Sequence, residues 1–153
     1  MGSITIDRES LVPLALLDAM DGEIQGKTRL QKLAFLLDEE ELGDQFDAYT
    51  YRKYDYGPFS KSLLEDIEDL EEKGLVEISK ERTVGGNTRY DYELKSSGED
   101  AVEKLTSRGG DIDIIFDAAQ AIADEYGDLS LRDLIEQVYD RHSEYTENSV
   151  YQY

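Results

Sequence analysis

Histidine and cysteine, the side chains that most often carry out metal and nucleophilic chemistry, are almost absent from this sequence. The chain has a single histidine, His142, and no cysteine. A cluster of histidine ligands, a thiolate metal site and a disulfide are therefore excluded. A Ser/His/Asp triad would have to use His142 itself, which we interpret instead as a surface residue on a last helical turn.

The other residues that could form a catalytic or ligand-binding motif lack the required spacing. Asp111-Ile112-Asp113 is not followed by the rest of a calcium loop, and Gly85-Gly86 is not followed by a lysine and a helix start, as a phosphate loop requires. An all-carboxylate site for Mg²⁺ or Ca²⁺ stays open, since carboxylates are abundant. We therefore expect no catalytic residues and no cofactor, and we predict that the chain is not an enzyme.

Lysine and arginine side chains are the residues that could bind nucleic-acid phosphates. The candidates all lie in the first 96 residues, and they are Lys27, Arg29, Lys32, Arg52, Lys53, Lys61, Arg82 and Arg89. Together they could form a basic patch that holds DNA. Alternatively, each could only balance a nearby carboxylate in a surface ion pair. The sequence leaves both interpretations open.

Aromatic residues are concentrated between positions 46 and 59, where Tyr56-Gly57-Pro58-Phe59 marks a turn. The tyrosine cluster at positions 49–56 could be a platform on which bases stack. We favour packing, because aromatic side chains beside a Gly-Pro pair commonly anchor a turn.

The chain is strongly acidic, with 36 acidic residues, 16 basic residues and a formal charge of −20. The surplus is spread evenly, at −10 for residues 1–96 and −10 for residues 97–153. An even spread favours adaptation to a salt-rich cytosol over a dedicated acidic binding surface. Apolar runs fall far short of the ~20 residues that span a bilayer, and no secretory signal is visible at Met1–Asp7. We expect a cytoplasmic protein with no membrane partner.

Apolar spacing predicts three helices, a β-hairpin and three further helices. The first helices begin near Ser10, at Thr28 (where Gln31 has capping-box spacing) and after Ser60 or Ser62. We expect Asp38–Glu41 to form a solvated acidic end of the second helix. Strands at Leu75–Ile78 and Arg89–Lys95 flank a turn at Val84–Asn87. The last helices carry Ala101–Leu105, Ile112–Tyr126 and Leu131–Val138, with caps expected at Ser97 and Ser130.

This order predicts an α+β, mainly α fold: a winged helix-turn-helix with a two-stranded β wing and extra C-terminal helices. We place the winged-helix domain at residues 1–96. Residues 97–153 would be a helical extension that packs on it or mediates dimerisation, so a homodimer is one expected arrangement.

Several motifs carry a resemblance to a known family. The segment Gly26-Lys27-Thr28-Arg29-Leu30-Gln31-Lys32-Leu33-Ala34-Phe35-Leu36-Leu37 resembles the G-x-T-x-L-Q-K-L-x-x-L-L helix of the YwgA-like family. The segments Tyr56–Ser60, Leu63-Leu64, Gly74–Val76 and Leu134–Tyr139 resemble it too. That family is similar to Panacea (SocA-like antitoxin) domains and to PadR-like winged-helix regulators. The resemblance implies a winged-helix fold and a role in transcription or partner binding, with no catalytic residues.

Two functions follow as expectations. The first is a winged-helix DNA-binding protein, a transcriptional regulator of a halophilic cell. The alternative is a protein-interaction module, an adaptor or antitoxin-like protein that does not bind DNA. The third helix favours the alternative, because residues 60–73 hold two lysines against six acids.

Overall fold

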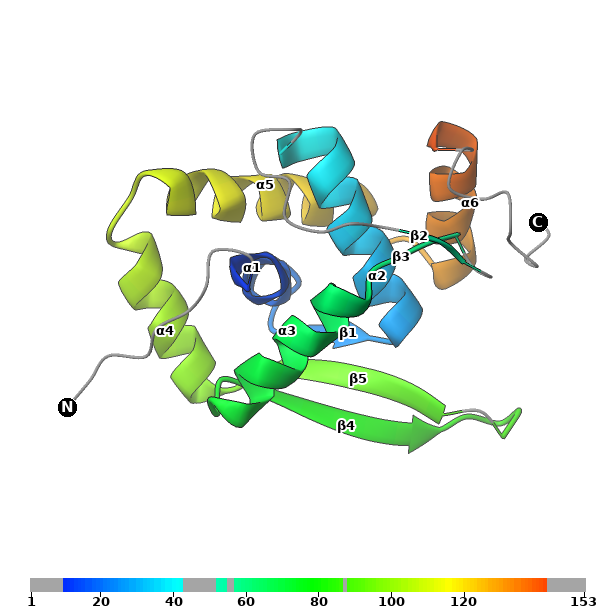
Figure 1. Cartoon of the computed structure of the whole chain (residues 1–153), viewed down its shortest axis with the longest axis horizontal. Helices are drawn as coiled ribbons and strands as arrows, with labels where there is room; N and C mark the ends of the chain where they lie inside the picture. The colour runs from blue at the N-terminus through cyan, green and yellow to red at the C-terminus, as the bar shows by residue number, and fades with distance from the viewer. Residues whose placement is uncertain (1–9, 43–51, 55–56, 87, 143–153) are drawn as a thin grey trace.

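A computed structural model describes residues 10–42, 52–54, 57–86 and 88–142. The chain is mainly helical with a small antiparallel sheet, so the predicted α+β class is confirmed (Figure 1). The helices are α1 (Leu11–Ala19), α2 (Lys27–Leu36), the π-helical turn η1 (Leu37–Leu42), α3 (Lys61–Glu72), α4 (Ser96–Thr106), α5 (Asp111–Tyr126) and α6 (Leu131–Arg141). None of these described helices combines the length and apolar character that a membrane crossing requires.

The main sheet has three strands in the order β1-β5-β4, namely β1 (Glu23–Gln25), β4 (Val76–Arg82) and β5 (Thr88–Leu94). The predicted hairpin is confirmed, since β4 and β5 pair antiparallel with Ile78 opposite Tyr92. The prediction of only two strands is wrong, because β1 pairs with the other edge of β5. A three-residue strand with one apolar side chain, Ile24, is too short for its alternation to be recognised in the sequence.

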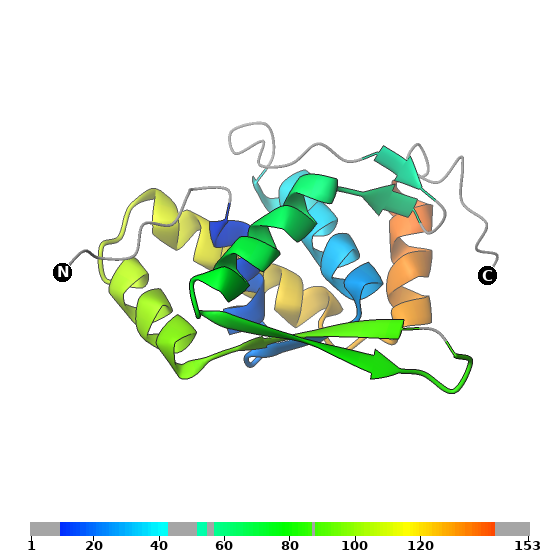
Figure 2. The same cartoon turned by 60° about the horizontal axis from the view of Figure 1, so that its bottom comes forward.

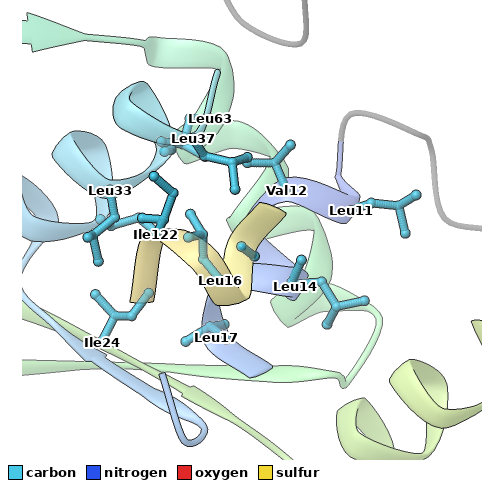
Figure 3. Packing of buried hydrophobic residues seen from close by; sticks show 14 of the residues in the cluster. Leu11, Val12, Leu14, Leu16, Leu17, Ile24, Leu33, Leu37, Leu63 and Ile122 are labelled. Carbon is cyan, nitrogen blue, oxygen red and sulfur yellow. The ribbon is translucent and has the colours of Figure 1, made fainter. Parts of the chain in front are cut away.

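Helix α1 lies at the centre of the molecule, and the other elements pack around it (Figure 1). The side chains from Leu11 to Leu17 are all buried, which explains why every residue of this stretch is apolar. Figure 3 shows side chains of α1, α2, α3 and α5 gathered in one interior, among them Leu16, Leu33, Leu63 and Ile122. Burial of apolar surface on this scale is the main force that holds such a fold together.

The helix starts agree in part with their sequence signals. Ser60 caps α3 and Ser130 caps α6, as predicted, because each hydroxyl accepts a hydrogen bond from a backbone N–H three residues later. The capping box at Thr28 and Gln31 is wrong, since α2 begins after Gly26 with no side-chain cap. Ser97 is not a cap either, because its hydroxyl donates to the carbonyl oxygen of Gly74.

The acidic segment after α2 agrees only in part with its prediction. Residues Asp38–Glu41 were expected to be solvated, and Glu39 and Glu41 are exposed, but Asp38 is only 8% exposed, and the segment belongs to η1. A π-helical turn widens the helix by one residue and often marks a functional position. Here it directs Glu40 toward the C-terminal helices.

The C-terminal helices contribute to the same apolar interior as residues 10–96. Helix α5 packs along α1, α4 packs on α1 and α5, and α6 packs on α2. The small pair of strands β2 (Arg52–Tyr54) and β3 (Gly57–Phe59) lies beside α2 and α6. The division of the chain at residue 96 stays a prediction.

Candidate functional site

Helix α3 is held in place by an unusual pair of hydrogen bonds from α2. The side-chain amide of Gln31 donates to the backbone oxygen of Ser60 and accepts from its backbone N–H, both at 2.8 Å. Both residues are buried. The glutamine therefore reproduces the two bonds that a neighbouring strand would make, and it sets the position at which α3 begins.

At the junction between α3 and the hairpin, the first turn of α4 packs directly against the backbone. Gly98, in the first turn of α4, lies against the chain just after α3, and a Cβ there would come within 2.3 Å of the carbonyl oxygen of Leu75. The backbone N–H of Lys95 also donates to that oxygen at 2.9 Å. Only glycine fits this approach, so α3, β4 and α4 share one rigid corner.

Helix α3 lies across one face of the hairpin (Figure 2). Side chains of the helix and of that face line a groove of about 390 Å³. On the helix side, Leu64, Ile67, Glu68 and Glu71 follow the i, i+3, i+4, i+7 spacing of one helical face. On the sheet side, two cross-strand pairs form the floor, and these are Ile78 with Tyr92 and Lys80 with Tyr90. Lys27, the first residue of α2, completes the lining.

The groove has opposite charges on its two sides. The ammonium groups of Lys27 and Lys80 lie over the ring of Tyr90, at 4.5 and 5.7 Å from its centre. Such cation–π contacts keep both ammonium groups at the groove mouth. Across from them, Glu68 is exposed, and Glu71 accepts a hydrogen bond from the N–H of Ile78 at 3.3 Å. Burial raises the pKa of Tyr92, so its phenol stays neutral on the floor.

The candidate cations of α2 do not form a shared patch. Lys27 belongs to the groove. Arg29 donates to the backbone oxygen of Leu129 at 2.9 Å, and its partial burial lowers the pKa of its guanidinium. Lys32 is 2% exposed, and burial lowers its pKa to about 7. These two side chains therefore face the protein rather than a ligand in solution.

The remaining candidate cations are spread over separate elements. Lys61 is exposed at the start of α3, and Arg82 is exposed at the end of β4. Arg89 makes a two-bond ion pair with Asp91 at 2.8 and 2.9 Å. Arg52 and Lys53 form part of β2, but their side chains lie outside what the structure describes. The structure thus leaves Lys61 and Arg82 as the exposed cations near the third helix and the hairpin tip.

A second polar cluster, which no sequence pattern indicated, joins η1 to the C-terminal helices. Glu40 accepts from the hydroxyl of Tyr126 at 2.5 Å and lies 2.9 Å from the ring nitrogen Nε2 of His142. Arg141 donates to the Tyr126 oxygen and to Glu125. His142 was expected at the surface, yet its side chain is 14% exposed and packs edge-on against Phe35.

This cluster is a structural link rather than an open site, because its groups satisfy one another. Burial and the hydrogen bond to Glu40 raise the pKa of Tyr126. The single histidine, His142, was the only signal in the sequence for this cluster. With 36 acidic residues in the chain, that signal could not identify Glu40 as its partner. Within the described part of the chain, no group of three or more histidine, aspartate or glutamate side chains is placed to hold a metal ion.

The aromatic cluster for which packing was favoured over a stacking platform lies outside what the structure describes. Tyr49, Tyr51 and Tyr56 lie outside the described residues, as do Phe46 and the side chains of Tyr54 and Phe59. The choice between stacking and packing stays a prediction. The groove tyrosines Tyr90 and Tyr92 are described. The alternating pattern of β5 predicted them only as strand residues.

Comparison with known proteins gives one partial relationship. The chain is 35% identical over 80 residues to the uncharacterized protein YwgA of Bacillus subtilis (strain 168). The match covers 50% of this chain and 44% of that protein, so the chain spans less than half of the relative's length. No family model matches the chain. The comparison supports a YwgA-like relationship and no finer one.

Proposed function

We propose that this chain is a protein-interaction module on a winged-helix scaffold, with α3 and the adjoining groove as its binding surface. The order of helix, short strand, two helices and hairpin supports this scaffold. Its motifs resemble the YwgA-like family, and the similarity of that family to Panacea and, more distantly, PadR-like proteins fits an adaptor or antitoxin-like role. Fold alone does not decide function, so the proposal depends on the surface.

The observation that carries the proposal is the series of exposed glutamates along α3, two of which, Glu68 and Glu71, also line the groove. The helix side chains at positions 65, 68, 71 and 72 are exposed glutamates, and only Lys61 opposes them within the helix. In a DNA-reading winged helix this element enters the major groove. Phosphates would be repelled from such a face, whereas a basic protein surface would be attracted to it.

A photo-crosslinking experiment tests the proposal. A photoreactive amino acid replaces Glu65 on α3 or, as the matched control, Glu103 on the exposed face of α4. In cells grown at their native salt concentration, we expect discrete protein adducts from position 65 and none of the same mass from position 103. Adducts to nucleic acid alone from position 65 would contradict the proposal.

A second candidate function is DNA binding, as a transcriptional regulator of a salt-rich cell. It is favoured by exposed Lys61 at the start of α3 and exposed Arg82 near the hairpin tip, where winged helices contact bases and backbone. Fluorescence anisotropy with a pool of random duplexes tests it across a KCl titration. Binding that Lys61→Ala and Arg82→Ala weaken, while Lys104→Ala does not, would favour DNA. Absence of binding at every KCl concentration would remove this candidate.

A further inference from the structure

The groove between α3 and the hairpin has a lining that specifies the chemistry of a partner segment. Its apolar and aromatic part is formed by Leu64 on the helix side and by Ile78 and the ring of Tyr90 on the floor. A volume of about 390 Å³ lies in the range of pockets that hold a small ligand or a few side chains. An apolar side chain placed there would displace water from surface that the fold itself leaves uncovered.

Three charged side chains at the mouth are not paired with one another. Among the described residues, no ion pair joins Lys27 or Lys80 to Glu68, although all three side chains belong to one lining. Both ammonium groups lie over the Tyr90 ring. An incoming carboxylate beside Tyr90 would therefore meet two positive charges, and an incoming ammonium or guanidinium beside α3 would meet Glu68.

Charged residues continue along α3 outside the groove, over a surface larger than a small molecule would cover. Exposed Glu65 and Glu72 continue the negative charge along α3, outside the groove lining. A free small ligand would leave these groups unmatched. A polypeptide segment with further basic residues would pair with them, so charge complementarity favours a peptide as the occupant.

We propose that the groove binds a partner protein through a basic segment that inserts one apolar side chain, with an acidic residue of the partner held between Lys27 and Lys80. This inference rests on the protein-interaction function proposed above and names the chemistry of the partner. The apolar residue lies on the floor, and a lysine or arginine of the segment faces Glu68.

Selection from a phage-displayed library of random peptides tests this inference on the full chain, at the lowest KCl concentration at which the chain is folded, because molar salt would screen the charges. We expect enriched peptides to share an apolar residue with an acidic residue on one side and a basic residue on the other. Lys80→Glu should weaken the best of these peptides about tenfold or more, because it turns an attraction into a repulsion. The matched control is Lys104→Glu on α4, which changes the net charge equally.

The outcomes separate this inference from the function on which it rests. Equal losses for Lys80→Glu and Lys104→Glu, a consensus without the apolar residue between opposite charges, or no enrichment at all would overturn the groove assignment. In each of those cases, protein adducts from position 65 would leave the interaction function standing. A second substitution, Glu68→Gln, should reduce the preference for a basic residue without removing the preference for an acidic one. The melting temperature of each variant confirms that it is folded.

Discussion

Gln31 and Ser60 form a contact in which one side chain satisfies two buried backbone groups. The glutamine amide has both a donor and an acceptor, and no apolar residue of similar size could replace it. This pairing gives a physical reason for the glutamine of the L-Q-K-L motif and the serine that follows Gly-Pro-Phe. Gln31 and Ser60 both belong to segments that resemble the YwgA-like family. Their role in this structure is to position α3.

Substitution of Gln31 by alanine should be strongly destabilising. It leaves the N–H and the carbonyl of Ser60 buried without these partners, and each such group costs about 1–3 kcal/mol. We therefore expect urea denaturation to show a loss of about 3 kcal/mol or more in the free energy of unfolding. The control Gln120→Ala removes an exposed glutamine from α5 and should change stability little. Equal effects of the two substitutions would show that the Gln31 bonds are not what holds α3.

Lys32 should make the stability of the chain depend on pH above neutrality. Burial lowers its pKa to about 7, whereas an unfolded lysine titrates near 10.4. Between these values the unfolded chain binds the extra proton, so the free energy of unfolding rises with pH. From pH 7 to pH 9 the Lys32 contribution should amount to about 2 kcal/mol.

The comparison variant for this measurement is Lys32→Met, which keeps a long unbranched side chain without the charge. Chemical denaturation at several pH values gives the free energy of unfolding of both proteins. The wild-type value should rise relative to that of the variant between pH 7 and pH 9. Parallel pH profiles would mean that Lys32 keeps an ordinary pKa in the folded chain.

At the scale of elements, the hairpin and α3 follow from their own sequences, but the link between η1 and α6 does not. Alternating residues define β5, and the capped amphipathic stretch after Ser60 defines α3. Glu40 and His142 are about a hundred positions apart, and the sequence predicts a solvated helix end for the segment around each of them. Their contact depends on the π-helical turn, which no local sequence pattern predicts.

Removal of the Glu40 charge should loosen α6 selectively. Glu40→Gln keeps the shape of the side chain but loses its charge-assisted contacts with His142 and Arg141. Hydrogen exchange followed by mass spectrometry should show faster exchange of backbone amides in α6, with α3 and the hairpin unchanged. Glu125→Gln, which alters a more exposed partner of Arg141, is the control. Unchanged exchange in α6 would show that apolar packing alone holds this helix.

At the scale of the whole molecule, the charge of −20 should make stability depend on salt. Exposed carboxylates repel one another in dilute buffer, and the screening length falls to ~3 Å at molar salt. We expect the melting temperature to rise from dilute buffer to molar KCl. A variant with Glu65, Glu72, Glu77 and Glu99 changed to glutamine should show a smaller rise, which separates charge screening from other effects of salt. A flat or falling melting temperature of the wild type would contradict this expectation.

The sequence by itself determined the local elements, because apolar spacing, caps and turn residues act over a few neighbouring positions. It therefore predicted the helices, the β4–β5 hairpin and the Ser60 and Ser130 caps. Only the tertiary structure decided which polar groups meet. Strand β1, the burial of Lys32, the Gln31–Ser60 bonds and the charged groove each need partners from distant segments. The positions of the charges in the sequence could not show that Lys27 of α2 and Lys80 of β4 lie over the ring of Tyr90.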